Sequence, residues 1–202
     1  MNLTVYFCWK LCVMKNNKIL LVFIILIAAA ALYRIIPGRP MGFAPQLAIA
    51  IFGGAVLKQK KWAFALPIFS MLLSDTLFEI LYRNGWSSYA GFYEGQGINY
   101  LLLAGIVFIG MAMGRISLVK IGAASLAAPI IYFLLSNLAT WAGHGGYNLP
   151  LTGEGLFQTY ALGLPFLYMS IAATITFNAV FFGMWAVIQG TLERNPVEMS
   201  AN

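Results

Sequence analysis

The run WAFALPIFSMLLSDTLFEILY, residues 62–82, is 21 residues long, and only Asp75 and Glu79 within it carry a charge at neutral pH. A helix of this length extends about 30 Å, which is the thickness of the hydrocarbon core of a bilayer. The run lacks the strict apolar–polar alternation that a strand of a membrane barrel shows. It therefore predicts a transmembrane helix that carries two carboxylates.

Five further apolar runs surround this one. They are residues 19–36, 45–57, 98–113, 121–141 and 160–189, the last with a break expected near Pro165. The chain is 61% hydrophobic and 9% charged, with mean hydropathy +0.82, whereas a soluble domain has roughly 25% charged residues. We therefore predict an all-α polytopic membrane protein, a single transmembrane domain over residues 1–202 with about six helices in one bundle.

The basic residues gather on one side of these helices if the helices alternate in direction. Nine fall on that side: Lys10, Lys15, Lys18, Lys58, Lys60, Lys61, Arg115, Lys120 and Arg194. Three, Arg34, Arg39 and Arg83, fall on the other. The positive-inside rule then predicts cytoplasmic termini, with residues 1–18 and 190–202 in the cytoplasm of a bacterial inner membrane. The net charge of +6 thus reflects orientation rather than nucleic-acid binding.

The N-terminal segment is apolar but too short to span a membrane, and we expect translation to begin at Met14. It contains Cys8 and Cys12, and the chain has a single histidine, His144. A metal site usually needs three or four such ligands, so neither a metal nor another cofactor is expected.

Two predicted helices contain similar sequences. ALPIFSMLLSD at 65–75 and AAPIIYFLLSN at 127–137 agree at six of eleven positions, and an E-G pair and a tyrosine follow both at similar spacing. This pattern indicates a parallel internal repeat in which the third and fourth helices correspond to the fifth and sixth. Chance similarity between apolar helices is the alternative.

Asp75 and Glu79 are the first candidates for a binding site. They are one helical turn apart and so share a face. Because a charged side chain at mid-membrane costs about 2.5–3.5 kcal/mol on insertion scales, we expect them to face the bundle interior or a wet cavity. A polar contact between Asp75 and Asn137, or extension of Glu79 to the outer interface, is the alternative.

Further candidates lie near the predicted outer ends of the helices. Asn137 and Trp141 share one helical face, and Tyr147 follows in the next loop. Arg39 lies in a loop, residues 37–45, with three prolines and two glycines. This arginine can pair with a carboxylate, bind an anionic solute group, or lie in solvent. The helical spacing of Ser170, Thr174 and Asn178 favours helix packing over ligand contact.

Several short motifs carry a family resemblance. They are Arg39-Pro40 with Phe43-Ala44-Pro45, Pro67 with Ser74-Asp75, Asn137 with Trp141 and Tyr147, and Leu164-Pro165-Phe166. Across residues 34–185 the chain resembles an uncharacterised bacterial inner-membrane family that is distantly similar to the S components of energy-coupling-factor (ECF) vitamin transporters. The resemblance implies a six-helix bundle that binds a vitamin-like solute from outside. It also implies a separate energising module, although the Ala-x-x-x-Ala docking pattern of S components is absent from the first helix.

We therefore expect a non-enzymatic uptake protein for a small, vitamin-like solute. The expected binding residues are Arg39, Asp75, Glu79, Asn137, Trp141 and Tyr147. A structural or assembly subunit is the alternative, because small-residue faces such as Ala50/Gly54 and Gly110/Gly114 allow close helix contact. An intramembrane enzyme is disfavoured because no base accompanies a nucleophile.

Overall fold

The computed structural model describes residues 16–143 and 148–194. The predictions for Cys8, Cys12, Met14, His144 and Tyr147 lie outside these residues. Helices are the only regular secondary structure in the described part. They are α2 (Asn16–Arg34), α3 (Gln46–Val56), α4 (Lys60–Arg83), α5 (Gln96–Ala112), α6 (Leu118–Ala142) and α7 (Gly153–Arg194). The all-helical prediction is thus confirmed for the described residues.

Within the part of the chain that the structure describes, three helices are long and apolar enough to cross a membrane: α4, α6, and α7 over Gly153–Val187. The other apolar helical segments are shorter: they are α3, α5 and the part of α2 from Ile25 to Arg34. The 11 residues of α3 extend about 16 Å, roughly half of the hydrocarbon core. This helix is short because Pro45 precedes it and the lysine-rich turn at 58–61 follows it.

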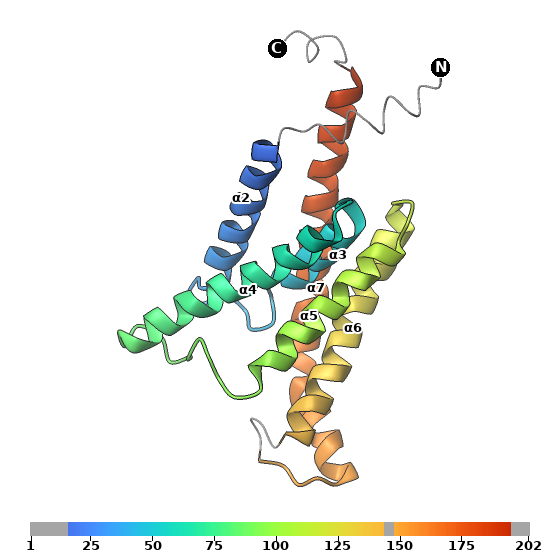
Figure 1. Ribbon diagram of the computed structural model, residues 1–202. Helices are drawn as coiled ribbons and strands as arrows, with labels where there is room; N and C mark the ends of the chain where they lie inside the picture. Colours follow the sequence, from blue (N-terminus) through green and yellow to red (C-terminus); the bar gives the residue numbers. More distant parts are fainter. Residues whose placement is uncertain (1–15, 144–147, 195–202) are drawn as a thin grey trace.

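The helices alternate in direction along the chain. Figure 1 shows that α2 begins, and α7 ends, at the upper end of the molecule, where the turn from α5 to α6 also lies. The connection from α6 to α7 is at the lower end. The alternation that the count of basic residues assumes is therefore present.

The prediction of a break near Pro165 is wrong. Pro165 lies inside a continuous α7, as Pro67 lies inside α4 and Pro129 inside α6. A proline removes one backbone hydrogen bond, and helices in membrane proteins tolerate it where neighbouring groups satisfy the freed carbonyl.

The core of the molecule surrounds α3, which packs against α4, α5, α6 and α7. Every residue from 46 to 51 is buried. Polar side chains share this interior: Gln46, Ser70, Ser74, Asp75, Gln96, Ser125, Thr159, Thr174 and Asn178 are all buried. Large apolar side chains such as Leu101, Phe157 and Val187 are at least 70% exposed, as expected of surfaces that contact lipid.

Two glycines bring α3 and α5 together. A Cβ added to Gly54 would lie 2.2 Å from the carbonyl oxygen of Val107, and one on Gly110 would lie 2.1 Å from that of Ile51. Close backbone contact of this kind is how small residues associate membrane helices. Gly54 and Gly110, both predicted as small-residue positions, therefore pack two helices of the same chain together.

The proposed internal repeat stays a prediction. Both of its segments, 65–75 and 127–137, are helical, and the proline of each is buried.

Candidate functional site

Asp75 is the centre of a buried polar cluster that joins α2, α4 and α5. Its side chain is 2% exposed and forms an ion pair with Arg34, at the end of α2. Its other oxygen, Oδ2, accepts hydrogen bonds from Gln96 Nε2 at 2.5 Å and from the Tyr100 hydroxyl at 2.6 Å. Arg34 also donates to Ser74 Oγ at 2.6 Å. The carboxylate thus has partners on both oxygens, as a buried charge requires.

Glu79 has a different role from Asp75. It forms an ion pair with Arg83, whose side chain is 76% exposed, and its Oε2 accepts the backbone N–H groups of Gly91 and Phe92. Gly91 is pressed against α4, because a Cβ there would lie 1.9 Å from the carbonyl oxygen of Asp75. Glu79 therefore fastens the loop 84–95 to α4.

Arg39 is held in place by backbone carbonyls. Its Nε donates to Arg34 O at 3.2 Å, and its Nη1 donates to Phe43 O at 2.5 Å and to Pro40 O at 3.3 Å. Burial, followed by the neighbouring charge of Arg34, lowers the pKa of Arg39 from its ordinary value. Since an arginine is effectively never deprotonated in proteins, the group stays cationic.

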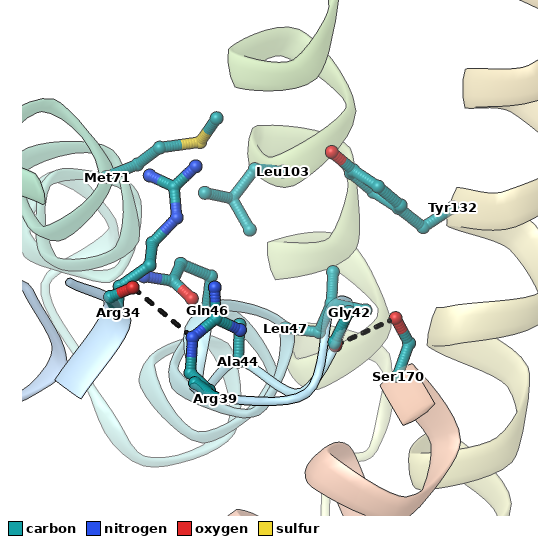
Figure 2. A pocket seen from close by; sticks show the side chains of 10 residues that line it. All are labelled: Arg34, Arg39, Gly42, Ala44, Gln46, Leu47, Met71, Leu103, Tyr132 and Ser170. Atoms are coloured by element: carbon teal, nitrogen blue, oxygen red, sulfur yellow. Dashed lines mark hydrogen bonds between the residues drawn. The ribbon is translucent and has the colours of Figure 1, made fainter. Parts of the chain in front are cut away.

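A cavity of about 210 Å³ lies beside these two arginines. Its lining residues are Arg34, Arg39, Gly42, Ala44, Gln46, Leu47, Met71, Leu103, Tyr132 and Ser170. Figure 2 shows Arg34, Arg39 and Gln46 on one side and Tyr132 and Ser170 across from them. Polar groups thus converge on an otherwise apolar hollow, which is the usual composition of a small-molecule site.

Gln46 has the most unusual environment of the lining residues. It is only 7% exposed, yet neither its Nε2 nor its Oε1 has a hydrogen-bond partner. An unpartnered buried amide costs about 1–3 kcal/mol, so the position of this side chain is unfavourable without a further hydrogen-bond partner.

The far wall of the cavity is built from hydrogen-bonded side chains. The Tyr132 hydroxyl of α6 donates to Asn99 Oδ1 on α5 at 3.1 Å, and Asn99 Nδ2 donates to the Tyr93 hydroxyl at 2.7 Å. Ser170 of α7 donates to the carbonyl oxygen of Gly42 at 3.2 Å. These bonds join α6 to α5, and α7 to the loop 35–45.

The structure does not bring all the predicted residues together. Arg39 lines the cavity, and Asp75 lies behind it as the partner of Arg34; Glu79 lies outside the lining. Asn137 hydrogen-bonds to Phe133 O in its own helix and packs against Gly163 of α7. Asp75 has its partners on α2 and α5, whereas Asn137 bonds within α6, so the two residues do not pair.

Trp141 is also outside the cavity lining. Its Nε1 donates instead to Pro150 O in the loop before α7. Of the polar residues spaced along α7, Ser170 lines the cavity. Thr174 donates to Ser170 O, and Asn178 donates to Ser125 Oγ of α6. The bond of Thr174 lies within α7, whereas that of Asn178 joins α7 to α6, as the prediction of helix packing expects for that residue.

The lining residues Arg34, Gln46 and Tyr132 were not predicted from the sequence. Arg34 and Gln46 stand at the ends of apolar runs, where polar residues are ordinary. The one available signal was that Asp75 needed a cationic partner, and Arg34 is on the same predicted side of the membrane.

A mostly apolar helical chain whose described residues include three helices long and apolar enough to cross a membrane is a membrane protein. The chain belongs to the DUF6580 family, described as a family of unknown function, which matches residues 14–196. No curated protein and no solved structure matches it.

Proposed function

We propose that this chain is a small-solute uptake protein of the bacterial cytoplasmic membrane, and that the cavity beside Arg39 and Gln46 is its binding site. The observation that carries the proposal is the buried, unpartnered amide of Gln46 in the wall of that cavity. A bound solute would supply the hydrogen bonds that the protein does not.

The size of the cavity limits the solute. Its volume of about 210 Å³ is roughly seven times the 30 Å³ share of one water molecule in the liquid. It lies below the roughly 300–1,000 Å³ of typical drug-sized ligand sites. The proposal is therefore a small metabolite, or the polar part of a vitamin-like molecule.

The distribution of basic residues supports an outward-facing site. The loop 35–45 forms part of the cavity wall and lies on the side with three basic residues rather than nine. Under the positive-inside rule this is the extracytoplasmic side, with both termini in the cytoplasm. The resemblance to ECF S components supports the further proposal that a separate module supplies energy for uptake.

Solute retention tests the proposal. Protein purified from membranes in mild detergent should release a small molecule on denaturation, detectable by mass spectrometry. Ala44→Phe places a phenyl ring at the cavity wall and should abolish retention. Ala172→Phe adds the same ring at a position of α7 outside the cavity lining and should retain the molecule as the wild type does.

Equal recovery of the molecule from the Ala44→Phe and Ala172→Phe proteins would contradict this use of the cavity. The proposal would also be contradicted if purified wild-type protein released no small molecule and whole cells that contain the protein took up no solute through it.

A further inference from the structure

We propose that the cavity recognises an anionic group, a carboxylate, held by the Arg39 guanidinium, the Gln46 amide and the N-terminus of α3. This inference rests on the proposed function, because it names the chemical class of the solute. Three separate features of the cavity support it.

The first feature is an uncompensated positive charge. The ion pairs of the described residues join Arg34 to Asp75 and Arg83 to Glu79, and Arg39 belongs to neither. Its partners are the carbonyl oxygens of Arg34, Pro40 and Phe43, which carry no net charge. Two arginines line the cavity, and Asp75 neutralises Arg34. The cavity therefore has one positive charge in excess, that of Arg39.

The second feature is the start of α3, which forms part of the lining through Gln46 and Leu47. The residue before the helix, Pro45, provides no side-chain cap, and the first N–H that it accepts is that of Ile49, at 2.9 Å. The backbone N–H groups of residues 46–48 precede this bond and so lie outside the helical ladder. N–H groups outside the helical ladder and the helix dipole make such an end favourable for an anion.

The third feature is the Gln46 side chain, which is more than nine-tenths buried and has no partner. In Figure 2 it lies with Arg39 on one side of the cavity. Its amide N–H₂ can donate to the same anion that the guanidinium binds. The Gln46 amide thus supports the same kind of ligand, an anion, as the charge of Arg39 and the N-terminus of α3 do.

The charge balance favours a carboxylate over a phosphate ester. A phosphate monoester carries about −1.5 to −2 charges at neutral pH, whereas one positive charge is free in the cavity. Because Nε and Nη1 of Arg39 donate to backbone carbonyls, Nη2 is the guanidinium nitrogen left to donate to one carboxylate oxygen, and the Gln46 amide can donate to the other. The apolar lining, Leu47, Met71 and Leu103, suits a short hydrocarbon or ring attached to that group.

Thermal stabilisation by matched acids and amides tests this inference. The probes are butyrate and benzoate, with butyramide and benzamide as neutral counterparts of the same shape. We expect the two acids, and neither amide, to raise the melting temperature of the detergent-purified wild-type protein. The Arg83→Gln variant, which changes an exposed arginine outside the cavity, should respond as the wild type does.

Two variants separate loss of binding from loss of folding. Gln46→Glu keeps the side-chain shape and places a carboxylate beside Arg39, so the variant should be stable without ligand and lose its response to the acids. Arg39→Lys keeps the charge but loses the planar set of guanidinium donors, and it should bind the acids roughly tenfold or more weakly, the loss expected for charge-assisted hydrogen bonds.

An unchanged response of Gln46→Glu to benzoate would overturn the assignment. Stabilisation by the amides but not the acids would also overturn it, yet would leave solute binding in the cavity intact. No response to any of the four probes, together with no retained solute, would contradict the proposed function itself.

Discussion

Asp75→Ala is expected to lower the melting temperature of the detergent-purified protein by roughly 6–12 °C. The change leaves Arg34 partly buried without its carboxylate partner, and breaking such a pair costs about 3 kcal/mol or more. In a chain of this size, one kcal/mol corresponds to about 2–4 °C. Gln96 and Tyr100 lose their acceptor as well. Differential scanning fluorimetry measures the effect.

The ion pair at the C-terminal end of α4 provides the matched control. Glu79→Gln removes a carboxylate from the same helix, but its partner Arg83 is 76% exposed, and exposed pairs contribute about 0–1 kcal/mol. The amide oxygen of the new side chain can still accept the N–H groups of the loop. The melting temperature should therefore fall by only about 0–4 °C.

Replacing both partners of the buried pair separates the charge from the shape. The double variant Arg34→Met with Asp75→Leu leaves no unpaired charge and should be more stable than either single variant, since apolar residues often replace a buried pair without loss. If the loss of stability in the double variant equalled the sum of the losses in the two single variants, the ion-pair interpretation would be contradicted.

Gly54→Ala and Gly110→Ala are each expected to destabilise the protein by about 1–3 kcal/mol, the usual cost of overpacking a core. The added methyl group meets backbone carbonyl oxygens of the facing helix, which cannot rotate away, so α3 and α5 must separate. The double variant should cost less than the sum, because the first substitution already separates the helices. Thermal unfolding in detergent measures all three.

Gly105→Ala is the control for this pair, since it lies on α5 with nothing within 4 Å of an added Cβ. It should be neutral or stabilising, by up to about 1 kcal/mol, because alanine favours a helix over glycine. A Gly110→Ala protein as stable as Gly105→Ala would contradict the close packing of α3 and α5.

The helical fold could be predicted because bilayer length and hydropathy act locally along the chain. The burial of Asp75 could also be predicted, because a charge in hydrocarbon must be shielded. Its partners could not, since the pairing of α2 and α5 with α4 depends on tertiary packing. The sequence therefore indicated a polar interior without indicating which side chains meet there.

Asn137 shows why the contacts of the remaining predicted residues could not be read from the sequence. It matches Asp75 in the internal alignment, but a neutral amide can satisfy itself on the carbonyl four residues earlier, as Asn137 does with Phe133. A carboxylate cannot, because carbonyls accept and do not donate. Gln46 was missed for the opposite reason: a polar residue at the start of an apolar run is ordinary, and only the packing of α3 in the core buries it.

A crystal structure of the protein purified from membranes without added ligand would show whether a solute occupies the cavity. We expect non-protein density in the cavity, within hydrogen-bond distance of both the Arg39 guanidinium and the Gln46 amide. A cavity closed by protein side chains, with the Gln46 amide hydrogen-bonded to the chain itself, would contradict this expectation.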